Sequence, residues 1–310
     1  MINFLHNYLP QPILFQLGFI RVYWYGALVV FGIILGLLVV LQLTKKQGIK
    51  KDEVYPPLFF RNRRDKIVTE NNKKFLRLQP EFLDKSGGVY DLGFYLIIFS
   101  TLGARIYAVL LDLNFYLKNP FEIIAVWHGG LAIHGAIIGG VLTLLIYCYK
   151  KNQSFWLWAD LIAVAIPLGQ ALGRWGNYFN QEIFGRPTDL AWGIPISLAN
   201  RPVEYINFQY FQPTFLYESG LDLVNFGVLL FLFVWVNKKN QELRIKNHGL
   251  VFLVYLVNYS LIRIFMEFLR IDPTPEIFGI RAPILVSLGI IIISLGLIIF
   301  KIKKIQSLRK

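Results

Sequence analysis

The sequence predicts an all-α polytopic membrane protein, built as a bundle of about seven transmembrane helices. Hydrophobic residues make up 55% of the 310-residue chain, whereas charged residues make up 16%, and the mean hydropathy is +0.50. Several apolar runs approach or exceed the roughly 18 residues that a helix needs to cross a bilayer. These runs lack a strict alternation of apolar and polar residues, which argues against an outer-membrane barrel.

Seven spans account for the apolar runs. We expect them at Val22–Leu43, Leu92–Leu111, Gly129–Tyr149, Phe155–Leu172, Thr214–Val236, Leu250–Leu269 and Ala282–Phe300. The segment Met1–Phe19 has no basic start and its apolar residues are interrupted, so it does not predict a cleavable signal peptide. We expect a single integral-membrane domain over residues 1–310, with a basic cytoplasmic loop at 44–91 and an extracytoplasmic loop at 186–213.

Lysine and arginine are distributed unevenly among the connections between these spans. The segments 44–91, 150–151, 238–246 and 301–310 together hold 23 of them, whereas the alternate connections hold five. Because basic loops remain in the cytoplasm, we expect the N-terminus outside and the C-terminus in the cytoplasm. The net charge of +13 follows from this topology, and we expect no nucleic-acid partner.

The polar stretch Gly173–Gly185, GRWGNYFNQEIFG, directly follows the fourth apolar run. It holds one arginine, two asparagines, one glutamine and one glutamate among three glycines. Polar groups at membrane depth usually face a bundle interior or a wet cavity, and a polar loop outside the membrane is the alternative. A helical continuation would align Arg174, Asn177 and Gln181, with Asn180 beside them. The glycines leave a broken or re-entrant helix as a further alternative.

The predicted topology places other polar residues in the outer half of the bilayer. Arg263 precedes Arg270 by seven residues on the outward-running sixth span, which puts it about 10 Å deep at about 1.5 Å per residue. His134 follows Gly129 by five residues on the third span, which puts it about 8 Å deep by the same rise. Residues near the outer ends of other spans join this layer: Tyr25, Arg174, Tyr217 and Glu218.

Residue types in this layer indicate a phosphate site. Two arginines can clamp a phosphate through paired hydrogen bonds, and a phospholipid headgroup is the phosphate available at this depth. Tyr259, Arg263 and Glu267 share one helix face, where a purely structural Arg–Glu ion pair is the alternative. His134 is a candidate acid–base group, because imidazole titrates near neutral pH; a satisfied core histidine is the alternative. The sequence has no Cys/His cluster of the kind that predicts a metal site, and we expect no cofactor.

At these motifs the chain resembles the bacterial phosphatidylglycerol–prolipoprotein diacylglyceryl transferase family. The signature is GRWGNYFNQEIFGRPTDLAWGI, at 173–194. Further motifs agree in order along the chain: IRVYWYG at 20–26, LGARIYAV at 102–109, GGLAIHG at 129–135, QPTFLYES at 212–219 and LIRIFMEFLR at 261–270. The resemblance covers essentially the whole membrane part, and it agrees with seven spans and an outside N-terminus.

The resemblance implies transfer of the sn-1,2-diacylglyceryl group from phosphatidylglycerol to the lipobox cysteine of a preprolipoprotein. A thioether forms and glycerol phosphate is released. The implied location is the bacterial inner or plasma membrane, with the active site toward the outer leaflet. The resemblance implies catalytic roles for His134, Arg174, Arg263, Tyr259 and Glu267. It also implies that phosphatidylglycerol binds to Arg174, Asn177, Asn180, Glu182, Tyr25 and Glu218.

The expected mechanism starts from the peptide thiol. Its pKa is about 8.5, and only the thiolate attacks, so the thiol must first lose its proton. We expect His134 to act as the base, while Arg174 and Arg263 stabilise the departing phosphate. Two features depart from the family pattern. Gln212 stands where the family often has histidine, and the insertion at 56–88 is atypical.

Two other function classes can use similar residues. A transporter or lipid scramblase would pass anionic headgroups along buried arginines, but it predicts ionisable residues through the full membrane thickness. The inner halves of these spans hold few. A non-catalytic membrane scaffold would not require arginine, carboxylate and histidine in one layer.

Overall fold

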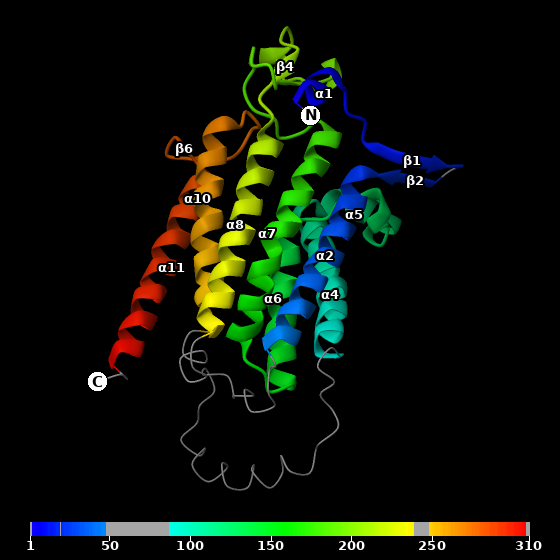
Figure 1. The fold of residues 1–310 in the computed structure, drawn as a ribbon. Helices are drawn as coiled ribbons and strands as arrows, with labels where there is room; N and C mark the ends of the chain where they lie inside the picture. The colour runs from blue at the N-terminus through cyan, green and yellow to red at the C-terminus, as the bar shows by residue number, and fades with distance from the viewer. Residues whose placement is uncertain (1, 19, 48–86, 239–247, 308–310) are drawn as a thin grey trace. The chain divides into compact units, whose positions relative to one another are not determined.

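The computed structural model of the chain describes residues 2–18, 20–47, 87–238 and 248–307. Within these ranges, seven helices are long and apolar enough to cross a membrane, which confirms the predicted fold class (Figure 1). They are α2 (Trp24–Gln47), α4 (Gly87–Leu111), α6 (Ile133–Lys150), α7 (Phe155–Asn180), α8 (Thr214–Lys238), α10 (Leu250–Leu269) and α11 (Ala282–Ser307). Most of the insertion expected at 56–88 and most of the basic loop at 44–91 lie outside the described residues.

The chain divides into two compact units. The first comprises Met1–Val39 and Ala159–Lys310, and the second comprises Val40–Trp158. In the first unit, α10 packs against both α8 and α11. In the second unit, α4 packs against α6. The single domain expected over the whole chain stays a prediction.

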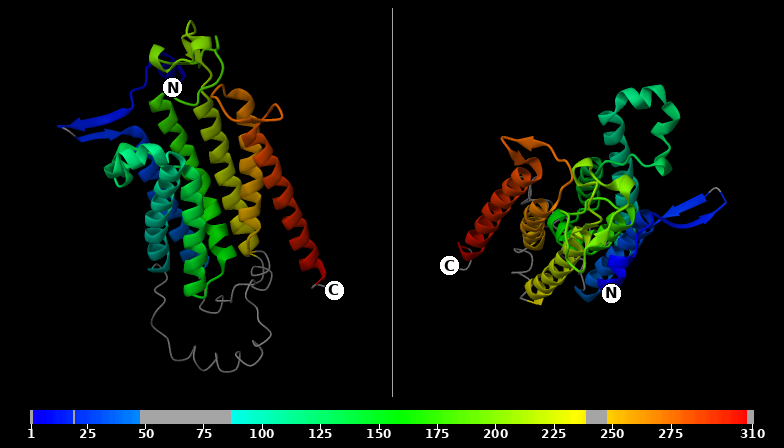
Figure 2. Two further views of the ribbon diagram at one scale, coloured as in Figure 1. Left: turned by 180° about the vertical axis from the view of Figure 1, so that it is seen from behind. Right: turned by 90° about the horizontal axis from the view of Figure 1, so that it is seen from above.

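Short elements connect the long helices. The first unit contains α1 (Ile2–Asn7), η5 (Leu198–Asn200), η6 (Val203–Tyr205) and three antiparallel hairpins, which pair β1 (Ile13–Leu17) with β2 (Ile20–Tyr23), β3 (Ile194–Pro195) with β4 (Tyr210–Phe211), and β5 (Glu276–Ile277) with β6 (Ile280–Arg281). The second unit contains α5 (Leu113–Lys118), η3 (Pro120–Ile123) and η4 (Val126–His128). The β1–β2 hairpin projects away from the helices of its own unit (Figure 2).

A small apolar core supports the end of the first unit where α7 finishes and α8 begins. Its buried members come from α1, the end of α7, the following connection and the first turn of α8: Leu5, Tyr178, Phe184, Ile194, Ile196, Phe211 and Phe215. The rings of Tyr178 and Phe215 stack with their centroids 4.5 Å apart. This core fixes the polar stretch 173–185 against the start of α8.

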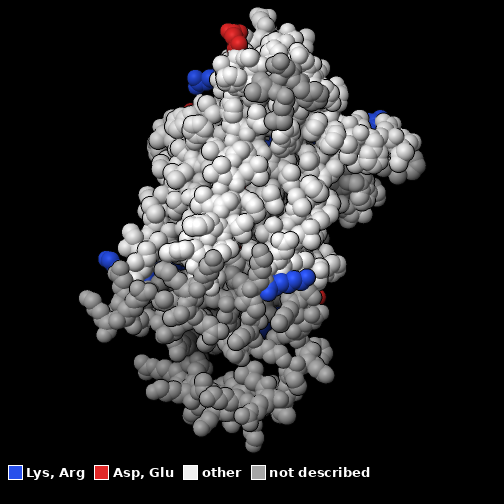
Figure 3. Space-filling model, viewed as in Figure 1, with Lys and Arg blue, Asp and Glu red and all other residues white. Residues whose placement is uncertain are grey.

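The outer surfaces of the long helices are apolar. Side chains such as Val30, Phe31, Leu223, Phe231 and Ile292 are exposed, as a membrane-spanning protein requires, because lipid is the solvent around it. On the face drawn in Figure 3, few charged side chains interrupt the described helix surfaces. Exposure of apolar residues therefore marks the lipid-facing side, and buried polar residues mark the interior.

Candidate phosphate site

Helix α7 continues without a break through Gly173 and Gly176 to Asn180, so the broken or re-entrant alternative is wrong. The expected alignment fails only at its last member. Gln181 has a positive φ of 53°, which takes it out of the helix. Its amide nitrogen donates to the carbonyl oxygen of Pro10 at 2.7 Å, and its amide oxygen accepts from the backbone N–H of Ser197 at 2.7 Å. The Gln181 side chain thus connects the segments that contain Pro10 and Ser197 by hydrogen bonds.

Two predicted substrate-binding residues in the last turn of α7 donate hydrogen bonds to a third, Glu182, just after the helix ends. The Asn177 amide donates to Oε1 of Glu182 at 2.8 Å, and the Asn180 amide donates to the same atom at 3.3 Å. Glu182 lies between two residues with positive φ, Gln181 and Ile183. A branched side chain such as that of Ile183 rarely adopts this conformation, and such strain clusters at functional sites.

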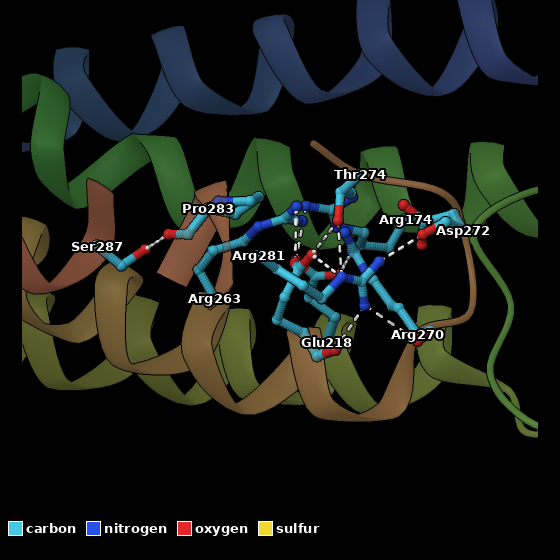
Figure 4. A network of polar contacts seen from close by, with 10 residues as sticks. Arg174, Glu218, Arg263, Arg270, Asp272, Thr274, Arg281, Pro283 and Ser287 are labelled. Atoms are coloured by element: carbon cyan, nitrogen blue, oxygen red, sulfur yellow. Dashed lines mark hydrogen bonds and ion pairs between the residues drawn. The ribbon is translucent and has the colours of Figure 1, made fainter. Parts of the chain in front are cut away.

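Glu218 on α8 lies between two arginines. Its Oε1 is 2.6 Å from Nη2 of Arg174, and its Oε2 accepts a hydrogen bond from Nη2 of Arg270. Arg174 also donates to Oδ1 of Asn177 at 3.4 Å, which links this pair to the Asn177–Glu182 cluster. Burial lowers the pKa of the Arg270 guanidinium from its ordinary value, and the charge of Glu218 acts in the opposite direction. Figure 4 shows Arg174, Arg270 and Glu218 directed toward one another.

Glu267 on α10 is shared in the same way. Its Oε2 lies 2.9 Å from Nη2 of Arg263, one helical turn earlier, and its Oε1 lies 3.1 Å from Nε of Arg281. Thr274 donates to the same Oε1 at 3.4 Å. The structural ion pair that the sequence left open between Arg263 and Glu267 is therefore present. Because Glu267 is divided between two arginines, it does not neutralise Arg263 alone.

The two glutamates and four arginines form one network (Figure 4). Both glutamate side chains are at most 1% exposed, whereas Arg174 and Arg263 are 18% and 19% exposed. Arginines outnumber the glutamates in this network, and arginine remains charged in proteins. Asp222, one turn beyond Glu218, lies within electrostatic range of Arg174 and Arg270. The partly accessible guanidinium groups of Arg174 and Arg263 fit an anionic ligand.

Tyr25 and Tyr259 also lie in the first unit. A Cβ on Gly176 would lie 2.5 Å from Cδ2 of Tyr25, so the Tyr25 ring occupies the space that a side chain would need. Tyr25 is itself 40% exposed. Tyr259 is half-buried, and its ring stacks on Tyr255 with centroids 5.9 Å apart.

His134 lies in the second unit, and its surroundings correct the sequence prediction. Helix α6 begins at Ile133 rather than at Gly129, so the depth estimated along a continuous helix does not apply. The carbonyl groups of Gly129 and Gly130 accept hydrogen bonds from Nη1 of Arg105 at 2.6 and 2.7 Å, which holds this segment outside the helix. His134 is exposed, so it is not a satisfied core histidine.

Sequence reasoning missed Arg270 and Arg281, which it assigned to outer connections. For Arg270 a signal was available, because it follows Arg263 by seven residues and returns to the same helix face. For Arg281 no local signal exists, since it reaches Glu267 across the β5–β6 hairpin. Among the described residues, no group of three or more His, Cys, Asp or Glu residues could hold a metal ion.

Most of the chain is similar to one family of known proteins. The family described as prolipoprotein diacylglyceryl transferase matches residues 12–61 and 72–300. The phosphatidylglycerol–prolipoprotein diacylglyceryl transferase of Parasynechococcus marenigrum is 39% identical over 264 residues, which cover 85% of this chain and 81% of the relative. The proteins of that name from Nostoc and Synechocystis are 39% and 38% identical over 263 residues, which cover 85% of this chain and 80% of each relative.

The match extends through the first and last spans and includes the arginine network. It agrees with the expectation drawn from the sequence motifs, and with an enzyme that works in a lipid environment. The chain therefore belongs to the prolipoprotein diacylglyceryl transferase family.

Proposed function

We propose that this chain transfers the sn-1,2-diacylglyceryl group from phosphatidylglycerol to the lipobox cysteine of a preprolipoprotein. The sulfur forms a thioether with the glycerol carbon, the carbon–oxygen bond to phosphate breaks, and glycerol phosphate leaves. This would be the first step of bacterial lipoprotein maturation. Family membership supports the reaction, and the residue roles below are our proposal.

The observation that carries the proposal is that two guanidinium groups of the arginine network remain partly accessible. The lipid phosphate has one negative charge before the reaction, and the released phosphate monoester has about two at neutral pH. Arg174 and Arg263 keep part of their side chains exposed and would bind this phosphate. Their interaction strengthens as the negative charge develops, so it lowers the barrier to carbon–oxygen cleavage.

The remaining predicted residues would position the two arginines or bind other parts of the substrates. Glu218 and Glu267 are buried and contact arginines, so we propose that they hold the guanidinium groups rather than bind the lipid directly. Asn177, Asn180 and Glu182 would bind the hydroxyl groups of the lipid headgroup. Tyr25 and Tyr259 would line the same site. His134 would accept the thiol proton, because a neutral imidazole nitrogen can act as a general base.

The chain is a multi-pass membrane protein, and we propose the bacterial inner or plasma membrane as its location. The N-terminus would lie outside and the C-terminus in the cytoplasm, with the phosphate site toward the outer leaflet. This orientation rests on the distribution of lysine and arginine among the connections. The partners would be phosphatidylglycerol, the signal peptide of a preprolipoprotein and the bilayer, with no nucleic acid.

The purified chain in nanodiscs, given labelled phosphatidylglycerol and a lipobox peptide, tests the reaction. We expect the peptide to gain the mass of diacylglycerol in a thioether that survives hydroxylamine treatment, which cleaves thioesters. A peptide with serine in place of cysteine should gain nothing. Arg174→Gln should abolish the gain, whereas an exchange at Arg186, exposed in the connection after α7, should preserve it. Headgroup movement between leaflets without peptide modification would favour the transporter or scramblase instead.

A further inference from the structure

Arg281 lies at the end of β6, immediately before α11, and uses its whole guanidinium group. Nη1 donates to the carbonyl oxygens of Glu267 and Arg270 at 2.8 and 3.1 Å, and Nη2 donates to the carbonyl oxygen of Asp272. Nε donates to Oγ1 of Thr274 at 2.7 Å. These carbonyl groups lie in the last turn of α10 and just beyond it, where a helix lacks backbone donors of its own. Arg281 therefore closes the C-terminal end of α10.

The same guanidinium group also determines how Glu267 is used. Nε of Arg281 lies 3.1 Å from Oε1 of Glu267, and Nη2 of Arg263 lies 2.9 Å from Oε2. Glu267 is completely buried, so its carboxylate requires a cation on each side. If Arg281 lost its charge, Oε1 would lose its cationic partner, and Arg263 is the other cation already in contact. A carboxylate accepts two parallel hydrogen bonds from one guanidinium group, so Glu267 would then bind Arg263 with both oxygens.

We propose that Arg281 is a positioning residue that keeps Arg263 available to the lipid phosphate by occupying half of Glu267. This inference rests on the proposed function, because it assigns the phosphate to Arg263. Arg281 is 19% exposed, but its donors are directed to the protein, so it acts through Glu267 rather than on the lipid. The same arrangement at Glu218, with Arg270 as the second cation, shows that the network uses it twice.

The test measures kcat and KM for phosphatidylglycerol in nanodiscs of graded lipid content, with a fixed excess of lipobox peptide. Arg281→Gln should raise KM by about 10-fold, the factor that corresponds to one charge-assisted hydrogen bond, with a smaller change in kcat. Arg281→Lys should recover part of this loss, because the ammonium group can still balance Glu267. A purely structural clamp on three carbonyl groups would not be restored by lysine, which lacks the planar fork.

A second exchange separates positioning from folding. In Arg281→Gln/Glu267→Gln, the neutral amide can no longer capture Arg263 as an ion pair, so KM should fall below that of Arg281→Gln alone. If Arg281 only caps α10, the two exchanges should add or worsen each other. Arg201 supplies the matched control, because it donates to the carbonyl oxygens of Ile196 and Ile206 at 2.9 and 3.0 Å. The described part of the chain shows no carboxylate partner for it, so Arg201→Gln should lower thermal stability without raising KM.

The outcomes separate this inference from the proposed function. A wild-type chain that forms no thioether would overturn the proposed function itself. An active wild-type chain with unchanged KM in Arg281→Gln, or with no rescue by Glu267→Gln, would overturn the role of Arg281 alone. Thermal midpoints of every variant in the same nanodiscs identify any variant that fails to fold. If Arg281→Gln fails to fold, Thr274→Val gives a second test, because it frees the Nε–H of Arg281 for Oε1 of Glu267. KM should then stay at or below the wild-type value, and a raised KM would overturn the role of Arg281.

Discussion

Nη2 of Arg174 on α7 lies 2.6 Å from Oε1 of Glu218 on α8, and the Glu218 side chain is only 1% exposed. The other oxygen of the same carboxylate binds Arg270. A buried carboxylate between two guanidinium groups is stable only while all three charges are present, because each desolvated charge depends on the others. The pair thus connects helix packing directly to the position of a predicted phosphate-binding arginine.

Glu218→Gln should destabilise the protein strongly. The neutral amide leaves Arg174 and Arg270 without their shared counter-charge, and breaking a buried pair costs about 3–5 kcal/mol. We expect a lower thermal midpoint in detergent and loss of thioether formation. Glu204→Gln, at an exposed position in η6, is the control and should leave both unchanged. Equal stability of the two variants would contradict a structural role for the buried pair.

Gly176→Ala should displace Tyr25. A Cβ at position 176 would lie 2.5 Å from the Tyr25 ring, and overpacking of this kind costs about 1–3 kcal/mol. We expect a raised KM for phosphatidylglycerol if Tyr25 lines the lipid site. Gly173→Ala, one turn earlier, is the matched control, because a Cβ there meets nothing within 4 Å. That variant should be as stable as wild type or slightly more stable. Similar kinetics for both variants would remove Tyr25 from the site.

Asp222→Asn should stabilise the protein. Asp222 is 1% exposed, and neither of its carboxylate oxygens has a hydrogen-bond partner among the described residues. It also lies near the like charge of Glu218, as well as near Arg174 and Arg270. The amide keeps the shape and removes an unsatisfied charge, so we expect a gain of about 1–3 kcal/mol, measured as a higher thermal midpoint. The exposed Asp189→Asn serves as control. A lower midpoint would show that the Asp222 charge balances the arginines.

Much of the fold could be predicted from the sequence because membrane spans are long and uniformly apolar. The helix ends differ from the predicted ones where tertiary contacts determine them. Helix α6 starts at Ile133 rather than Gly129 because Arg105 takes the carbonyl groups of Gly129 and Gly130. Helix α7 extends past Leu172 to Asn180, because its polar end packs against α8 and the residues that follow, where hydropathy is no guide.

The site was predicted only in part, because sequence spacing reveals contacts along one helix but not contacts between elements. Spacing along one helix placed Arg263 and Glu267 together, and the structure confirms their contact. The sharing of each glutamate between two arginines depends on contacts between elements that no spacing rule reveals. Arg281, for example, reaches Glu267 from a hairpin that follows α10. The roles of His134 and of the substrate-binding residues stay predictions.

Arg105→Lys should release the segment that precedes His134. Arg105 donates to the carbonyl oxygens of Ile123, Gly129, Gly130, Glu122 and Ala125. Lysine has three donors and no planar fork, so several of these buried carbonyl groups would lose their partner. We expect a loss of about 2 kcal/mol or more and faster amide exchange of the backbone N–H groups over 122–130. Arg21→Lys, at an exposed position on β2, should change neither. Unchanged exchange in Arg105→Lys would assign the order of this segment to other contacts.

His134→Asn should separate lipid binding from chemistry. The amide retains a polar side chain but cannot accept the thiol proton near neutral pH, so thioether formation should be lost. Binding of phosphatidylglycerol should persist, because the proposed phosphate ligands are Arg174 and Arg263 in the other unit. Single-turnover formation of the thioether and retention of labelled lipid in nanodiscs measure the two properties separately. His128→Asn is the matched control, since His128 is also exposed and already contacts Glu122 at 3.0 Å. Full activity of His134→Asn would move the role of base to another residue, while joint loss of binding and activity would make His134 a lipid ligand instead.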